Sequence, residues 1–149
     1  MDETLGSRAR VLVADDETEI RHVLYDLLSP LYDCDVVASA EEAVERLREG
    51  GYDLVISDIM MGGMSGLELI PRVGELSPDT VVIMISGVQT VESAINALRA
   101  GAFDYVMKPF DLHHVEAAVS ALRVVRYASP SERSAPSSSC VRRATISSR

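Results

Sequence analysis

Cysteine is scarce in this sequence, and long apolar runs are missing. The two cysteines, Cys34 and Cys140, lie far apart, so they suggest neither a disulfide framework nor a zinc-binding spacing. The longest apolar run, Val81 to Ile85, is far too short to cross a bilayer. Asp2 and Glu3 stand where a secretory signal would carry basic residues. We therefore expect a soluble protein of the reducing cytoplasm, without membrane contact.

Positive charge is also in short supply. The 149 residues carry 14 basic and 23 acidic side chains, which gives a net charge of −9. Nucleic-acid backbones are bound by clustered Lys and Arg, so an acidic chain of this kind is not expected to bind DNA or RNA directly. Lysine is almost absent: Lys108 is the only one, and the other 13 basic residues are arginines.

What the sequence does contain is a regular alternation of two patterns. Short continuous apolar runs are typical of strands that are buried on both faces, as in a parallel sheet. They occur at Val11 to Ala14, Val36 to Ala38, Leu54 to Ile56, Val81 to Ile85 and Tyr105 to Met107. Between them lie segments with apolar residues at helical spacing. Two such stripes are Ile20, Leu24, Leu27, Leu28 and Leu31, and Val91, Ala94, Ile95 and Leu98.

Helix boundaries can be read from capping and breaking residues. Pro71 interrupts the apolar pattern of the third helical segment, which we expect to be kinked or shortened there. Candidate N-terminal caps and C-terminal stops are well placed around the other segments. They are Ser39 with Glu42, Thr90, Asp111, Gly50-Gly51 and Gly101.

Five strands alternating with five helices predict an α/β fold, a doubly wound five-stranded parallel sheet with helices on both faces. Ligands of such sheets usually bind in a crevice at the carboxyl ends of the strands. The chain is long enough for one domain, and residues 127–149 have a different composition. From residue 129 onward there are eight serines, two prolines and four arginines but few large aliphatics. We expect this Ser/Arg-rich tail to be disordered.

Polar residues follow the predicted strands at their carboxyl ends. They are Asp15-Asp16 after the first strand, Asp58 after the third, Ser86 after the fourth and Lys108 after the fifth. Three carboxylates gathered at one edge would repel one another, so such a site requires a cation. Carboxylate oxygens and open coordination positions favour Mg²⁺.

The same set of residues suits phosphoryl transfer. A carboxylate such as Asp58 can attack phosphorus and form an acyl phosphate if the charge on the transferring group is offset. The metal would offset part of this charge and Lys108 the rest, while the Ser86 hydroxyl offers a hydrogen bond.

These residues resemble the receiver domain of bacterial two-component response regulators, from Arg10 to about Arg126. Five elements carry the resemblance: the acidic pair in VLVADDE, the segment DIMMGGMSG from Asp58, Ser86-Gly87, Tyr105 and Lys108-Pro109-Phe110. The resemblance implies a receiver domain at residues 8–126 with a flavodoxin-like sheet of strand order 2-1-3-4-5.

The resemblance also implies a role for each site residue. Asp58 would be the phosphoacceptor, and Asp15 and Asp16 would bind Mg²⁺ together with Asp58 and the Met60 backbone carbonyl. Ser86 and Lys108 would bind the phosphoryl group. Ser86 and Tyr105 would act as the switch, although Tyr105 could instead be a plain half-buried aromatic whose hydroxyl faces water.

Partners follow from the same resemblance. A sensor histidine kinase or a phosphotransfer protein would phosphorylate Asp58. A downstream protein would then meet the face made by the fourth helix, the fifth strand and the fifth helix, and a phosphorylation-dependent homodimer could form through it. The chain would not be a turnover enzyme, because its phosphoryl transfer and autodephosphorylation act only on itself.

One departure from the family pattern affects the loop after Asp58, and the residues that flank the pocket bear on hydrolysis. Gly62 stands where the family usually has proline, which loosens the loop. Met60 and Val88 occupy the positions that flank the pocket, and neither side chain can orient a hydrolytic water. We therefore expect slow hydrolysis of the phosphoryl group.

Two other functions remain open. A phosphohydrolase of the haloacid-dehalogenase type also uses an aspartate nucleophile, Mg²⁺ and a lysine, but it needs an acid two residues past the nucleophile, where this chain has Met60. A phosphorylation-independent interaction module would keep the fold without using the site.

Overall fold

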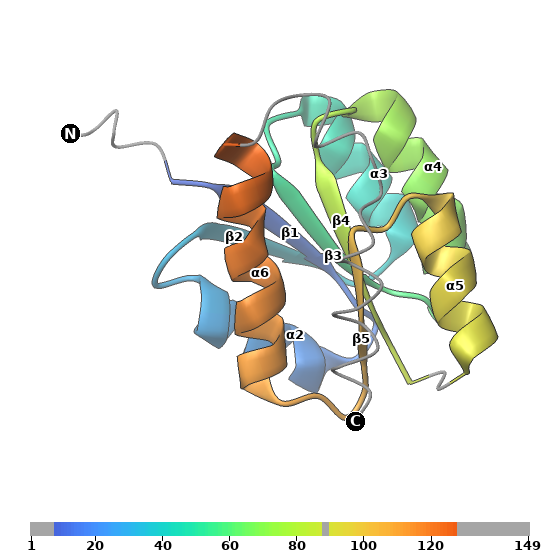
Figure 1. The fold of residues 1–149 in the computed structure, drawn as a ribbon. Helices are drawn as coiled ribbons and strands as arrows, with labels where there is room; N and C mark the ends of the chain where they lie inside the picture. The colour runs from blue at the N-terminus through green and yellow to red at the C-terminus, as the bar shows by residue number, and fades with distance from the viewer. Residues whose placement is uncertain (1–7, 88–89, 128–149) are drawn as a thin grey trace.

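Five parallel strands form a single sheet in the order β2-β1-β3-β4-β5 (Figure 1). The computed structural model describes residues 8–87 and 90–127, with side chains up to residue 121. The strands are β1 (Arg10–Ala14), β2 (Asp33–Val37), β3 (Leu54–Asp58), β4 (Val81–Ser86) and β5 (Asp104–Met107). The predicted fold class, strand direction and strand order are confirmed.

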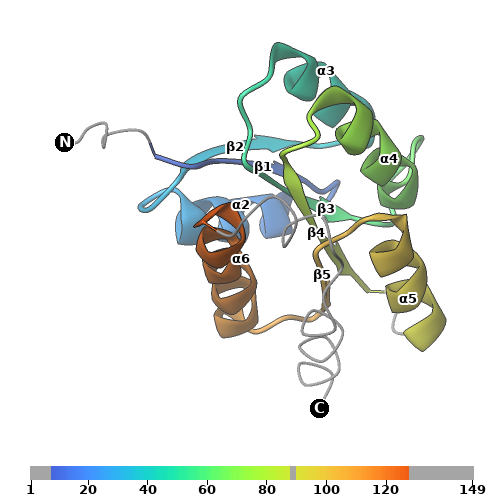
Figure 2. The ribbon, with the colours of Figure 1, turned by 45° about the horizontal axis from the view of Figure 1, so that its top comes forward.

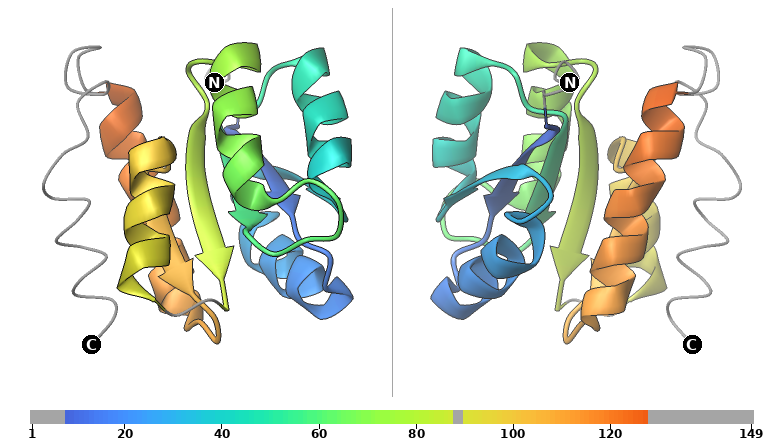
Figure 3. Two further views of the ribbon diagram at one scale, coloured as in Figure 1. Left: turned by 90° about the vertical axis from the view of Figure 1, so that its right-hand side faces the viewer. Right: turned by 90° about the vertical axis from the view of Figure 1, so that its left-hand side faces the viewer.

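Helices cover both faces of this sheet, so that the molecule has three layers (Figure 2). The helices are α2 (Thr18–Leu28), α3 (Ala40–Glu49), α4 (Gly66–Leu76), α5 (Val91–Ala100) and α6 (Leu112–Tyr127). One face carries α3, α4 and α5, and the other carries α2 and α6 (Figure 3). The predicted tail covers residues 127–149. Residue 127 is the last residue of α6, and residues 128–149 lie outside the described residues.

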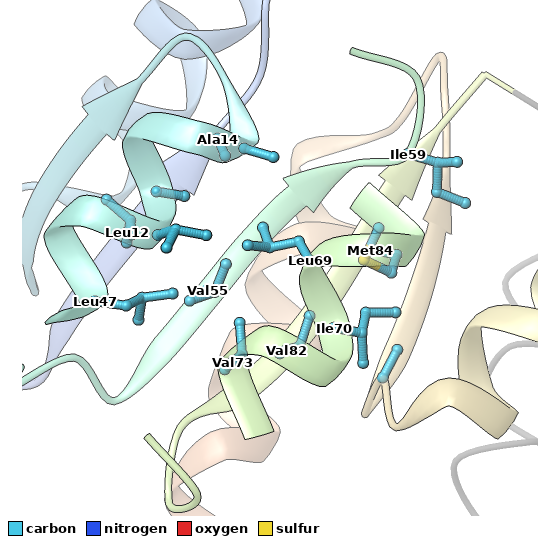
Figure 4. Close-up of a cluster of buried hydrophobic side chains, with 14 of the residues drawn as sticks. Leu12, Ala14, Leu47, Val55, Ile59, Leu69, Ile70, Val73, Val82 and Met84 are labelled. Atoms are coloured by element: carbon cyan, nitrogen blue, oxygen red, sulfur yellow. The ribbon is translucent and has the colours of Figure 1, made fainter. Parts of the chain in front are cut away.

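The core consists of two apolar clusters separated by the sheet. Successive strand residues point to opposite faces, so Leu12 and Ala14 join one cluster while Val11 and Val13 join the other. In the first cluster, side chains of β3 and β4 meet those of α4, for example Val55, Val82 and Leu69 (Figure 4). Burial on both faces explains why the central strands appear in the sequence as unbroken apolar runs.

The second strand begins earlier than predicted. Its first three residues are Asp33, Cys34 and Asp35, and it ends at Val37 instead of Ala38. β2 is an edge strand that pairs only with β1 and is only partly buried, so polar residues are tolerated in it. An apolar run therefore marked only its last part.

The predicted apolar stripes of two helices are partly wrong. Leu31 lies beyond the end of α2 and is exposed. On α5, Val91 and Ile95 are also exposed, at 76% and 41%, whereas Ala97 is fully buried. Ala97 faces the core, with Ala94 packed against the same cluster, in place of Val91 and Ile95. The larger apolar side chains consequently remain on the outer surface.

Pro71 does not end its helix, because α4 runs through it over 11 residues from Gly66 to Leu76. The prediction of a shortened helix is therefore wrong, while the alternative of a kink stays a prediction. Ser65 and Glu68 form a capping box that satisfies two backbone N–H groups at its start. Buried Leu69, Ile70 and Val73 offset the hydrogen bond that proline cannot donate.

The other predicted caps are found. The side chains of Ser39, Thr90 and Asp111 accept hydrogen bonds from backbone N–H groups in the first turns that follow them. Gly50 and Gly101 stand at the C-caps of α3 and α5. Within the part of the chain that the structure describes, no helix has the length and apolar character needed to cross a membrane.

Gly66 allows α4 to pack directly against the end of β3. A Cβ at this position would overlap the Asp58 backbone carbonyl and lie 2.6 Å from Met84 Cε. We expect Gly66→Ala to lower the free energy of unfolding by about 1–3 kcal/mol, because backbone atoms must shift to admit the methyl group. Urea denaturation monitored by circular dichroism measures this change.

Gly74 is the matched control, because it lies in the same helix and a Cβ there would meet nothing within 4 Å. Gly74→Ala should raise the free energy of unfolding by about 0.5–1 kcal/mol, since alanine favours the helix over glycine. Equal effects of the two substitutions would contradict the close packing at Gly66.

Candidate functional site

The register of the strands brings the chemically active residues to one edge of the sheet. Ala14 pairs with Ser57, Asp58 pairs with Ile85, and Ser86 pairs with Met107. Asp15, Asp58 and Lys108 therefore emerge side by side at the carboxyl ends of β1, β3 and β5, although long stretches of sequence separate them. Parallel pairing alone accounts for this convergence, as expected for doubly wound sheets.

The Lys108 ammonium group is the electrostatic centre of this edge. Its Nζ atom lies 2.9 Å from Asp58 Oδ2, 3.0 Å from Asp15 Oδ2 and 2.7 Å from Glu17 Oε1. Burial lowers the pKa of Lys108, but the close contacts with Glu17, Asp58 and Asp15 outweigh it, and the pKa is raised. The ammonium group thus stays charged at neutral pH.

Asp15 is a buried carboxylate whose pKa is raised. Burial is the main cause, and the hydrogen bond from Glu17 N to Oδ1 (2.8 Å) and the charge of Lys108 offset it only in part. Oδ2 is buried and accepts no well-directed hydrogen bond from the described residues, so its short contact with Lys108 acts as an ion pair. This oxygen is left available for a cation.

Asp58 is buried at the end of β3, and both of its carboxylate oxygens are engaged. Oδ1 accepts a hydrogen bond from Met60 N (3.1 Å), and Oδ2 accepts one from Lys108. Asp16 is exposed beside it. Carboxylate oxygens of Asp15, Asp16 and Asp58 all lie within 4.8 Å of one another, a spacing at which one cation can bind all three.

The other predicted site residues surround this group. Ser86 is fully buried, and its backbone carbonyl accepts a hydrogen bond from Lys108 N at 2.7 Å. Tyr105 is only 3% exposed and belongs to the apolar cluster on the α4 and α5 side, so the alternative of a half-buried ring is wrong. The Met60 side chain is 64% exposed. Val88 lies outside the described residues.

The loop between Asp58 and α4 is anchored despite its two glycines. Met60 N is fixed by Asp58, and Met64 N donates to Glu41 Oε2 of α3 at 2.8 Å. Gly63 has a φ of +79°, and a Cβ there would lie 2.5 Å from the same Glu41 oxygen. Glycine at this position thus permits the anchor that Glu41 provides.

Among the described residues that contact Lys108 with a carboxylate, Glu17 is the one that the sequence patterns did not single out. It contacts Lys108 from 91 positions away along the chain. The only sequence signal was its place directly after the acidic pair, where an exposed helix-initiating glutamate is common and needs no partner.

Comparison with known proteins agrees with this geometry. A model of the response regulator receiver domain matches residues 11–120. The chain belongs to the response-regulator receiver family. It is 38% identical over 114 residues to the DNA-binding transcriptional regulator NtrC of Azospirillum brasilense, covering 76% of this chain and 24% of that protein. The response regulator PilR of Pseudomonas aeruginosa is 37% identical over 120 residues, covering 79% of this chain and 27% of that protein.

The receiver assignment covers only part of those relatives, since this chain spans about a quarter of the length of NtrC and PilR. Solved receiver domains are matched over nearly their whole length and cover about three quarters of this chain. The beryllofluoride-activated DrrB receiver has a TM-score of 0.74 and 27% identity over 78% of this chain and 98% of that one. The beryllofluoride-activated NtrC4 receiver dimer has a TM-score of 0.69 and 33% identity, covering 77% and 93%.

Receiver domains are in general phosphoacceptors and not turnover enzymes, and they bind a divalent cation in an acidic pocket. The residues of this chain fit such a cation. Three carboxylates converge, and the buried Asp15 Oδ2 lacks a well-directed hydrogen bond among the described residues. Lys108 balances only one of their charges, so a divalent cation would complete the neutralisation.

Asp15 gives a test of this charge balance. Because burial raises the pKa of Asp15, the unfolded chain ionises this residue at lower pH than the folded protein does. In the unfolded chain the pKa of this carboxyl group is about 4. As the pH rises from below that value through the higher pKa of the folded protein, ionisation of Asp15 therefore lowers the free energy of unfolding. We expect Asp15→Asn to raise the free energy of unfolding of the metal-free protein at pH 7, measured by urea denaturation.

The advantage of Asp15→Asn should shrink as the pH falls towards about 3, where the carboxyl group is neutral in both states. Asp33→Asn is the control, because that carboxylate is largely exposed on the edge strand. A stabilisation that is the same at both pH values, or that Asp33→Asn reproduces, would argue against a burial penalty at Asp15.

Proposed function

We propose that this chain is the phosphoacceptor of a two-component phosphorelay and is phosphorylated on Asp58. The observation that carries the proposal is the contact of Lys108 Nζ with Asp58 Oδ2 at 2.9 Å, within a cluster of three carboxylates able to bind one cation. Membership of the receiver family supports it. A sensor histidine kinase or a phosphotransfer protein would supply the phosphoryl group in the cytoplasm.

The chemistry follows from the placement of the charges. An Asp58 carboxylate oxygen attacks phosphorus, the new O–P bond forms, and the N–P bond to the donor histidine breaks, leaving the electron pair on the imidazole. Lys108 stabilises the negative charge on the phosphoryl oxygens, and the Ser86 hydroxyl donates a hydrogen bond to one of them. Mg²⁺, bound by Asp15, Asp16, Asp58 and the Met60 carbonyl, would neutralise further phosphoryl charge.

The signal would leave the site through Ser86 and Tyr105. Tyr105 lies in β5 with its side chain buried between the sheet and the α4–α5 layer, so its rotamer is coupled to the packing of α5. The face of α5, β5 and α6 exposes Val91, Ile95 and Leu112. Exposed aliphatic side chains of this kind suit a protein partner or a second copy of the chain. A related receiver, NtrC4, was solved as a beryllofluoride-activated dimer.

The two alternatives have less support. A phosphohydrolase of the haloacid-dehalogenase type would need an acid at position 60, and the side chain there is an exposed methionine. A module that ignores phosphorylation would have no use for a buried, charge-imbalanced carboxylate cluster, which lowers stability. The acidic charge of the chain also disfavours direct nucleic-acid binding.

Phosphorylation of Asp58 is tested with acetyl phosphate and Mg²⁺. We expect the intact mass to rise by about 80 Da, one HPO₃ unit. The adduct should disappear in Asp58→Asn and when EDTA removes the metal. Asp16→Asn should slow the reaction by weakening metal binding. Mass spectrometry of the intact protein follows all four samples.

Each alternative predicts a different result in the same experiment. Catalytic release of phosphate, many turnovers per protein, would indicate a phosphohydrolase. No adduct on the wild-type protein, despite a folded circular dichroism spectrum and added Mg²⁺, would indicate a phosphorylation-independent module.

The exposed Met60 side chain leads to a prediction about the lifetime of the phosphoryl group. Hydrolysis of the acyl phosphate needs an in-line water, which a polar side chain at position 60 would orient and methionine does not. We expect Met60→Asn to shorten the lifetime several-fold, measured as loss of the adduct mass after the donor is removed. Met60→Leu, which adds no polar group, is the control. If the lifetime in Met60→Asn is unchanged or longer, this account of slow hydrolysis fails.

A further inference from the structure

Glu17 uses its side chain in an unusual way for the residue that begins a helix. It is the N-cap of α2, yet its side chain forms no capping hydrogen bond. Its carboxylate extends instead to Lys108, and the 2.7 Å contact is the shortest of the three that the ammonium group makes with carboxylates. The Glu17 backbone N–H also holds Asp15 Oδ1. Glu17 thus contacts two residues of the proposed phosphorylation site.

The three carboxylates around Lys108 differ in how easily they can leave. The side chains of Asp15 and Asp58 are 2% and 6% exposed, whereas that of Glu17 is 59% exposed. Rotation of Glu17 into water leaves no buried charge without a partner, while withdrawal of either aspartate would. Of the three contacts of Lys108, the one with Glu17 therefore costs the least free energy to break.

Phosphorylation favours such an exchange. An ammonium group has three N–H donors, and Lys108 Nζ already lies within 3.0 Å of three carboxylates. A phosphoryl group on Asp58 carries close to two negative charges in place of the single charge of the carboxylate, and it adds several strong acceptor oxygens. Lys108 Nζ donates hydrogen bonds to Glu17 and Asp58 and forms a close ion pair with Asp15. A phosphoryl oxygen that approaches the ammonium group would be repelled by these carboxylates, so its approach favours the withdrawal of one of them.

We propose that Glu17 is the exchangeable partner of Lys108, holding the ammonium beside Asp58 before phosphorylation and giving way to a phosphoryl oxygen afterwards. The inference rests on the proposed phosphorylation of Asp58 and makes Glu17 a positioning residue for it. Glu17 competes with the phosphoryl group for the same donor, so its charge sets how strongly the site binds that group.

Beryllofluoride, a phosphoryl mimic that adds to an aspartate, measures this competition without a kinase. We expect Glu17→Gln to bind beryllofluoride roughly five- to tenfold more tightly than the wild type at saturating Mg²⁺. The reason is that a neutral amide is a weaker competitor for the ammonium than a carboxylate. Isothermal titration of the full chain gives the affinity, with Mg²⁺ affinity measured separately because loss of a nearby carboxylate weakens cation binding.

Glu19→Gln is the matched control. Glu19 is exposed in the first turn of the same helix, so this substitution removes the same charge from the same region. Competition at Lys108 predicts a clear gain in affinity for Glu17→Gln and little change for Glu19→Gln. Equal gains would mean that general electrostatics explains the effect, and no gain for Glu17→Gln would overturn the proposal.

Lys108 offers a direct spectroscopic reading, because it is the only lysine in the sequence. Lysine-selective isotope labelling therefore gives side-chain NMR signals from one residue. Without beryllofluoride, the signals of wild type and Glu17→Gln should differ, since position 17 contacts Nζ. With beryllofluoride they should converge, because residue 17 has then left.

A difference that persists unchanged in the beryllofluoride complex would show that Glu17 stays on Lys108, and would overturn the exchange. A different result would contradict the proposed phosphorylation of Asp58. In that case neither the wild type nor Glu17→Gln would bind beryllofluoride, although both unfold cooperatively at similar urea concentrations. That result would remove the basis of the inference together with the proposed function.

Discussion

The ion pairs of one ammonium group organise the functional edge of this protein. Lys108 contacts Asp15, Asp58 and Glu17, which come from the β1–α2 junction and the end of β3, while Lys108 itself follows β5. The contact thus spans the sheet from its inner strands to its edge. One positive charge cannot balance three carboxylates and the neighbouring Asp16, so the site keeps a net negative charge that favours a bound cation. The proposed cation binding and the proposed control of phosphoryl charge would both follow from this imbalance.

The apolar layers make that imbalance possible. Two clusters on opposite faces of the sheet bury β3 completely and β1 and β4 beyond their first residues, and they hold the strand ends in a fixed register. Gly66 lets α4 approach the carbonyl of Asp58, and Glu41 anchors the loop from the neighbouring helix. Burial disfavours the charged form of Asp15 and so lowers the stability of the fold. The burial of apolar side chains in the core offsets this loss.

The outer surface of the α5–β5–α6 region follows from the same packing. On α5, Ala97 lies on the inner side, and Val91 and Ile95 are left on the outside. Tyr105 is buried beneath this region, in the strand β5 that ends directly before Lys108. Lys108, which would contact the phosphoryl group, is therefore joined to the proposed partner face of α5, β5 and α6 by the short strand β5.

By itself, the sequence determined the fold class, the strand order through its family resemblance, and the group of Asp15, Asp16, Asp58 and Lys108. Runs of apolar residues are unambiguous when a strand is buried on both faces, and parallel strands must bring their carboxyl ends to one edge. Only the tertiary structure decided the polar start of β2, the true inner face of α5 and the contact of Glu17 with Lys108. Each of these depends on which surface a neighbouring element covers, and contacts across 91 residues leave no local pattern in a single sequence.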